Sequence, residues 1–301
     1  MPRDGFLNLL KPPGMTSHDV VAAVRSRLRM QRVGHLGTLD PAAAGVLPIS
    51  VGRATRLFDY AAGETKGYRA EVTFGLTTDT LDAEGSVTGI GDAGALTRVE
   101  LLDLLPRFIG DIEQVPPAYS AIQVNGKRLY ELARKGEAPV VRPRQVRIDS
   151  IALIGFWPGP RARALLDVVC EAGTYLRVLA YDLGCAIGCG AYLTFLLRTR
   201  VGRFELPEAL ILEEVDAASQ RGDLLDSVLP MDWPLAHLPA STLAEEDARR
   251  FGQGTRVASD IAAAEVVRVY GPGESFLGIG AVSEGQLRPR VVVAGPGESA
   301  A

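Results

Sequence analysis

The segment GHLGTLDPAAAG, residues 34–45, places one acidic side chain, Asp40, inside a glycine-rich loop. Its glycines allow backbone conformations closed to other residues, and Pro41 stiffens the chain directly after the acid. Such a loop can aim a single carboxylate at a substrate, as a nucleophile or as a stabiliser of a cation-like transition state. An isolated Asp-Pro pair is equally typical of a turn whose carboxylate bonds its own backbone, so Asp40 alone leaves both interpretations open.

Two predicted strands and a helix flank this loop and must set its position. Residues 5–10 form an apolar run that ends at Lys11-Pro12-Pro13-Gly14, which indicates a strand leading into a turn. Apolar residues then recur at helical spacing to residue 28, with Ser17 as the expected N-cap and arginines near the end. Residues 46–51 are again apolar and predict a strand directly after the loop.

The middle of the chain mixes strands and helices without a regular βαβ repeat. Alternation over residues 68–74 predicts a half-buried strand, and apolar spacing predicts a helix within residues 96–109. The other expected elements are strands over residues 140–156 and 164–171 and helices over residues 129–135, 175–183 and 192–197. This order favours an α+β fold over a doubly wound sheet.

A proline-flanked segment, residues 230–234, indicates a link between two domains, because the composition changes after it. We set the boundary near Met231, which gives a large domain over residues 1–231 and a small one over residues 232–301. The small domain is expected to contain a helix over residues 243–251 and strands over residues 264–270, 275–282 and 288–293. It is therefore predicted to be a β-rich module.

Charge is unevenly distributed along the chain. The 301 residues carry a formal net charge of −4, but residues 205–301 hold 7 Lys or Arg against 16 Asp or Glu, which leaves residues 1–204 at +5. A basic body permits contact with phosphates, although solvated surface charge is the ordinary use of such residues. No signal sequence or membrane-length apolar run is evident, so we expect a cytoplasmic protein without membrane contact.

The three cysteines, Cys170, Cys185 and Cys189, lack the Cys-x-x-Cys spacing of a metal site. We expect reduced, buried thiols rather than a disulfide or a zinc site. The acidic run that contains Asp79 and Asp82 has no bidentate acid where an EF-hand loop needs one. The sequence therefore predicts no metal site.

The loop motif Gly-His-Leu-Gly-Thr-Leu-Asp-Pro, followed by Gly-Val-Leu-Pro-Ile, resembles the active-site motif of the TruB-type tRNA pseudouridine synthases. Other motifs of that family occur in its order over roughly the first two thirds of the chain: KPPGMTS from Lys11, KGY from Lys66, TDTLDAEG from Thr78, PPAYSA from Pro116, NGKRLYELAR from Asn125, GTYLR from Gly173 and LRT from Leu197. The resemblance implies the pseudouridine synthase fold, with a mixed, mostly antiparallel central sheet flanked by helices. It also implies that the C-terminal module is PUA-like.

The same resemblance implies an isomerase that converts uridine to pseudouridine at position 55, in the T-arm loop of tRNA. This reaction needs no cofactor, so none is expected. Asp40 corresponds to the family's catalytic aspartate. Arg177 corresponds to an arginine that can keep this carboxylate ionised and aimed through two parallel bonds. Tyr68 corresponds to the active-site tyrosine, which is expected to stack on the uracil.

A uridine inside a folded loop must be extruded, which leaves a gap in the base stack. By resemblance His35 enters this gap, Leu196 packs against the base, and Asp82 helps to hold the RNA or the active-site loop. Four further residues are predicted to bind the substrate: Lys11, Lys127, Arg128 and Tyr175. The basic segment at about residues 120–147 is the predicted RNA-binding insertion, since RNA loops are recognised by shape and backbone contacts.

The resemblance implies a stand-alone enzyme that needs no protein partner, and we expect a monomer. An RNA-guided scaffold subunit is an alternative, although such relatives carry extended basic regions that this acidic tail lacks. A tRNA folding chaperone is another, and that activity could coexist with catalysis. A hydrolase that uses Asp40 and Asp82 as a carboxylate pair is a third, and it would need a raised pKa on one acid.

Overall fold

Strands from distant parts of the chain form one nine-stranded sheet in the computed structural model, which describes residues 4–61, 65–119, 123–124, 127–129, 137 and 141–293. The main path is β1 (Gly5–Lys11), β3 (Ala44–Val51), β12 (Ala191–Val201), β4 (Thr65–Phe74), β11 (Arg163–Glu171), β10 (Arg144–Trp157) and β7 (Gly110–Gln114). β2 (Val33–His35) joins β3, and β13 (Phe204–Glu205) joins β12. β3 and β12 pair in parallel, and the other pairs are antiparallel. The predicted mixed, mostly antiparallel sheet is confirmed.

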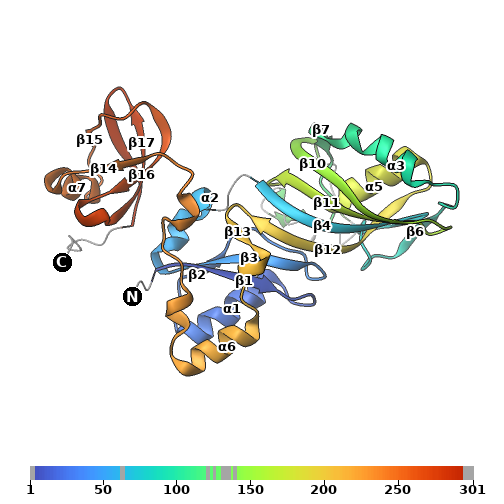
Figure 1. The fold of residues 1–301 in the computed structure, drawn as a ribbon, viewed down its shortest axis with the longest axis horizontal. Coiled ribbons are helices and arrows are strands. Elements are labelled where there is room, and N and C mark those ends of the chain that lie inside the picture. The colour runs from blue at the N-terminus through green and yellow to red at the C-terminus, as the bar shows by residue number, and fades with distance from the viewer. Residues whose placement is uncertain are drawn as a thin grey trace.

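Helices cover two separate parts of this sheet (Figure 1). α1 (Ser17–Leu28) and α6 (Leu212–Arg221) pack under β1 and β3 in a core that includes Leu7, Val20 and Val215. α5 (Leu176–Ile187) and α3 (Arg98–Leu104) share a second core with β4 and β11. The shorter elements are α2 (Phe58–Ala61), β5 (Leu76–Thr78), β6 (Val87–Ile90), β8 (Gln123–Val124), β9 (Lys127–Arg128), and the 3-10 helices η1 (Gly52–Leu57), η2 (Leu105–Phe108), η3 (Leu206–Glu208), η4 (Leu224–Ser227) and η5 (Trp233–Leu235).

The first helix begins one residue earlier than predicted. Thr16 is its N-cap, because the Thr16 hydroxyl accepts a bond from Asp19 N while the Asp19 carboxylate accepts one from Thr16 N. Ser17 lies inside the helix with its side chain buried, so its prediction as the cap is wrong. Its hydroxyl is thereby free to bond a different part of the chain.

The predicted helix over residues 192–197 is wrong, because these residues belong to strand β12. Ala191 and Leu193 are both buried and lie on the same face of the strand. β12 lies between β3 and β4, which supply backbone partners along its two edges. This pairing between distant segments overrides the local apolar spacing. The predicted helix over residues 129–135 lies outside the described residues except for its first position.

A five-stranded sheet forms the C-terminal part of the chain. Its order is β14 (Ala240–Thr242), β16 (Ala264–Tyr270), β17 (Phe276–Ser283), β18 (Gln286–Val292) and β15 (Val257–Ala258), with α7 (Glu245–Gly252) and η6 (Pro272–Glu274) beside it. Ile279 and Val293 of this part share a core with Leu36, in the loop after β2, and with Val46 of β3. The β-rich module is confirmed, and the boundary near Met231 stays a prediction.

Two further expectations concern the cysteines and the membrane. Cys170 is buried as predicted, but Cys185 is exposed, because Leu179 and Leu183 occupy the sheet-facing side of α5. The prediction of buried thiols is therefore wrong for Cys185, and Cys189 is only partly buried. Within the described ranges, no helix has both the length and the apolar character needed to cross a membrane.

Candidate active site

Asp40 lies in the loop between β2 and β3, and three buried side chains hold that loop. The first is Ser17, whose hydroxyl accepts a bond from Leu39 N at 2.9 Å and lies 3.3 Å from Leu39 O, to which it can donate. These contacts join the loop to α1. The residue immediately before the acid is thus held through both of its backbone polar groups.

The second support is Lys11, which the sequence analysis predicted to bind the substrate. Its side chain is fully buried, and Nζ donates to the carbonyl oxygens of Pro12, Met15 and Pro41 at 2.8, 2.7 and 3.1 Å. An ammonium has three donors, so Lys11 has none left for a ligand. Burial lowers its pKa to about 8. This geometry fits a residue that holds the Asp40 loop in place better than one that binds RNA.

The third support is Arg198 on β12, which is fully buried. Its guanidinium donates to Val46 O at 2.8 Å, to Gly37 O at 3.0 Å and to Thr38 O at 3.3 Å. Gly37 has φ +88°, a conformation that favours glycine. One arginine therefore fixes both the path of the loop and its junction with β3.

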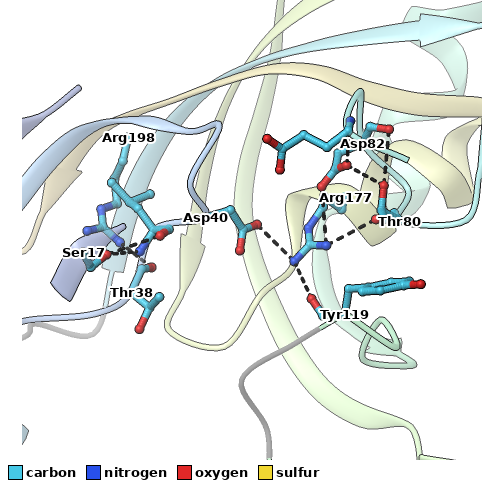
Figure 2. Close-up of polar contacts among 10 residues, drawn as sticks. Ser17, Thr38, Asp40, Thr80, Asp82, Tyr119, Arg177 and Arg198 are labelled. Atoms are coloured by element: carbon cyan, nitrogen blue, oxygen red, sulfur yellow. Dashed lines mark hydrogen bonds and ion pairs between the residues drawn. The ribbon is translucent and has the colours of Figure 1, made fainter. Parts of the chain in front are cut away.

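Arg177 reaches Asp40 from the start of α5, and Figure 2 shows it between two carboxylates. Arg177 Nη2 lies 3.0 Å from Asp40 Oδ2, and Nη1 lies 3.5 Å from Asp82 Oδ2. The two parallel bonds expected between Arg177 and Asp40 are thus absent, because the guanidinium is shared. Nη1 also donates to Thr80 O at 3.2 Å and Nη2 to Tyr119 O at 3.0 Å.

Asp82, which contacts Arg177, and Tyr175, which precedes it at the start of α5, are both held by hydrogen bonds. Asp82 Oδ1 accepts bonds from Thr80 Oγ1 at 2.5 Å and from Glu84 N at 3.1 Å. At the helix start, the buried Gln114 side chain accepts a bond from Tyr175 N at 2.9 Å and donates to Tyr175 O at 3.3 Å. The guanidinium is therefore preorganised before any substrate binds.

Burial raises the pKa of Asp40 above its ordinary value, and the charge of Asp82 adds to this, while Arg177 acts in the opposite direction. The Asp40 side chain nevertheless remains 43% exposed, through a pocket of about 330 Å³. The lining residues are Thr38, Leu39, Asp40, Lys66, Tyr68, Gly173, Thr174, Tyr175, Leu176, Arg177 and Leu196. A carboxylate in such a pocket can act on a substrate of the size of a nucleoside.

The pocket brings together five of the predicted site residues: Asp40, Tyr68, Tyr175, Arg177 and Leu196. Tyr68 lies on β4 and is 8% exposed, and burial raises the pKa of its phenol while the Arg198 guanidinium opposes that rise. The phenol is thus held neutral at the pocket wall. Asp82 does not line the pocket, but it contacts the site through Arg177.

His35 lies on β2 outside the pocket lining. Its ring packs edge-on against His18, with ring centroids 5.4 Å apart, and its Nδ1 is buried without a hydrogen-bond partner among the described residues. Burial, with the nearby His18 and Arg198, lowers its pKa to about 4. The imidazole is therefore neutral at pH 7.

The predicted RNA-binding insertion falls mostly outside the described residues. Lys127 and Arg128 form the short strand β9, which pairs with Gln123 and Val124, and their side chains are not among the described parts. Their predicted contact with RNA stays a prediction.

Sequence reasoning missed two residues of the site, Arg198 and Lys66. Both occur in quoted motifs, LRT and KGY, so the signal was present without a role attached. Lys66 stands two residues before Tyr68 on the same strand, and that spacing alone places both side chains on one face. In the described part of the chain, no group of three or more His, Cys, Asp or Glu could hold a metal ion.

A pocket of this volume, with an exposed carboxylate held by a buried guanidinium, is typical of an enzyme active site. Comparison with family models gives three matches: the TruB family pseudouridylate synthase N-terminal domain over residues 25–176, the tRNA pseudouridylate synthase B C-terminal domain over residues 177–236, and the pseudouridine synthase II TruB C-terminal domain over residues 239–293.

Curated relatives give the same result. A tRNA pseudouridine synthase B of Symbiobacterium thermophilum is 53% identical over 83% of this chain and 82% of its own length. One of Gloeothece citriformis is 43% identical over 96% of this chain and 97% of its own. In a solved Cbf5-Nop10-Gar1 complex, the matching chain superposes with a TM-score of 0.75 at 25% identity, over 98% of this chain and 86% of that one. The chain belongs to the TruB family of pseudouridine synthases and is an isomerase of that class.

Proposed function

We propose that this enzyme isomerises the uridine at position 55, in the T-arm loop of tRNA, with Asp40 as the catalytic carboxylate. The observation that carries the proposal is the contact of 3.0 Å between Asp40 Oδ2 and Arg177 Nη2 in a pocket that Tyr68 and Leu196 also line. The names of the bacterial relatives support tRNA as the substrate.

The reaction breaks the bond between ribose C1′ and uracil N1 and joins C1′ to C5 of the same uracil. Asp40 either attacks C1′ and is displaced when C5 attacks, or stabilises positive charge at C1′ while a proton is removed from C2′ and later returned to it. In both routes the carboxylate must be ionised and aimed, which the Arg177 contact supports. One proton leaves C5 and one is added at N1, so the reaction is an isomerisation without a redox step.

The surrounding residues suit an extruded nucleotide. Tyr68 and Leu196 offer an aromatic and an aliphatic surface to the uracil, and Tyr175 lies beside them. Outside the pocket, a neutral His35 ring can enter the gap that the uridine leaves without bringing a charge into the base stack. Lys127 and Arg128 would contact the phosphate backbone of the T arm.

The test is incubation of the purified protein with a tRNA transcript, followed by mapping of the modified base. Wild type should form pseudouridine at the T-arm position without guide RNA or added protein. Asp40→Asn should bind the same tRNA and form none. Turnover by Asp40→Asn, modification at another position, or release of free uracil as the main product would contradict the proposal.

A guide-RNA requirement would contradict the stand-alone activity. We also propose that the protein acts as a monomer, because one chain supplies all the described residues that line the pocket. Sedimentation at working concentration tests this, and a dimer would overturn it.

A further inference from the structure

Lys66 is a cation in the pocket wall to which the proposed reaction assigns no role. β4 alternates its side chains, so Lys66 and Tyr68 point to the same side of the sheet, and both line the pocket. Gly67 between them faces the other side, where a Cβ would lie 2.9 Å from Thr199 Oγ1. The strand thus directs the ammonium and the phenol into one space.

The Asp40 loop can pack closely against the Lys66 ammonium because Gly37 has no side chain at the point of contact. A Cβ on Gly37 would lie 3.1 Å from Lys66 Nζ, which places the amine directly against the loop. Gly37 is held there by the bond that its carbonyl accepts from Arg198. The amine is therefore positioned against the rigid segment that carries Asp40.

The surroundings of Lys66 are unfavourable for a cation in the free enzyme. Its charged or titratable neighbours are Arg198 from β12, a second cation, and Cys170 from β11, whose pKa burial raises to about 11 so that the thiol is neutral. No described residue forms a hydrogen bond or an ion pair with its Nζ. Burial accordingly lowers the pKa of Lys66 to about 8.

The other cations of the site already have acceptors. Arg177 is shared by Asp40 and Asp82, while Arg198 and Lys11 bond backbone carbonyl oxygens. Lys66 alone among these four has no acceptor in the described part of the chain. A half-buried ammonium without a partner costs stability, and an arriving anion would remove that cost.

We propose that Lys66 is a substrate-contacting residue whose ammonium binds a negatively charged oxygen of the extruded nucleotide. This inference rests on the proposed function. The oxygen has two sources: a phosphate of the flipped nucleotide, or the uracil after its bond to C1′ has broken. In that step the electron pair of the C1′–N1 bond stays on N1 and spreads to O2 and O4. The charge is discharged as C5 bonds to C1′ and N1 gains a proton.

The experiment compares wild type with Lys66→Met, which keeps the length of the side chain without its charge, and Lys66→Arg, which keeps the charge. Arg107→Met, at an exposed position on η2, is the control for loss of one cation elsewhere. RNA affinity is measured against salt concentration in the Asp40→Asn background, where no turnover occurs. The single-turnover rate at saturating RNA is measured with Asp40 present.

A phosphate source predicts that Lys66→Met weakens RNA binding about tenfold and reduces the slope of log affinity against log salt by about 0.7 to 0.9. A uracil source predicts unchanged affinity and a single-turnover rate about 10 to 100 times slower. In the second case the wild-type rate also falls as pH rises through about 8, where Lys66 loses its proton, and the fall is smaller for Lys66→Arg, in which only Lys11 titrates in that range. Either result supports the proposal.

The proposal would be overturned if wild type forms pseudouridine and Lys66→Met has an RNA affinity and a single-turnover rate within about twofold of wild type. It would also be overturned by a fall in the melting temperature of Lys66→Met of more than about 5 °C with activity that Lys66→Arg does not restore, because Lys66 would then be structural. A wild-type protein that forms no pseudouridine at all would instead overturn the proposed function.

Discussion

Arg177 and Asp40 meet with unequal exposure: the Arg177 side chain is 6% exposed and the Asp40 side chain 43%. The guanidinium approaches from within the protein, so substrate reaches the pair from the carboxylate side. Arg177 Nη1 contacts Asp82 (Figure 2), so the single positive charge of Arg177 is shared by two carboxylates. Asp40 therefore keeps both an orientation and a raised pKa.

Arg177→Lys should slow the single-turnover rate by about 100-fold or more, because a lysine carries one point donor and cannot contact Asp40 and Asp82 together. RNA binding should change little. The comparison is Arg107→Lys at an exposed position, which should react at the wild-type rate. A rate for Arg177→Lys within threefold of wild type would contradict the role assigned to the shared guanidinium.

Asp82→Asn should shift the acid limb of the rate profile to lower pH. The charge of Asp82 helps to raise the pKa of Asp40, so removing that charge lowers the pKa of Asp40 and keeps it ionised in more acidic solution. The maximal rate should also fall, because an amide holds Arg177 less firmly. The check is the single-turnover rate against pH, with the exposed Asp79→Asn as control. An acid limb that stays in place or moves upward contradicts this prediction.

Ser17→Ala should lower the free energy of unfolding by about 1 to 2 kcal/mol, since Leu39 N would be buried without its acceptor. The rate should fall with little change in RNA affinity, because the loop that aims Asp40 is loosened. Ser26→Ala, exposed on the same helix, controls for the loss of a hydroxyl. Denaturant unfolding and single-turnover kinetics measure the two effects. Equal stability of the two variants would mean that the Ser17 bond to the loop contributes nothing.

His35 should make stability depend on pH between about 6.5 and 4. The pKa of His35 is lowered to about 4 in the folded protein, so the unfolded chain takes up a proton in this range and the folded protein does not. Stability from this residue is present above pH 6.5 and is lost as pH falls through about 4, and solvent screening of the partly exposed ring reduces the size of the loss. His35→Asn should flatten that part of the curve. The exposed His237→Asn should not, and a matching effect at His237 would contradict the assignment.

Local sequence patterns predicted the elements in which the spacing of the apolar residues itself sets which side of the helix or strand is buried. Strand β3 after the Asp40 loop, helix α1 and the β-rich C-terminal part all follow from apolar spacing and from turn residues. The loop itself was evident from its glycines and Pro41. Strand β12 was not, because its character comes from β3 and β4 on its two sides and not from its own spacing.

The sequence by itself determined which chemical groups are available: one carboxylate in a constrained loop, a tyrosine in a strand, and an arginine at the start of a helix. The tertiary structure alone decided how these groups are placed. It sets the contact of Arg177 with Asp82, the burial of Lys11 and the position of the Lys66 ammonium in the pocket wall. Sequence order carries no distance between residues on different strands. Sheet register and helix packing set those distances, and with them the pKa values and the exposure that make these groups a site.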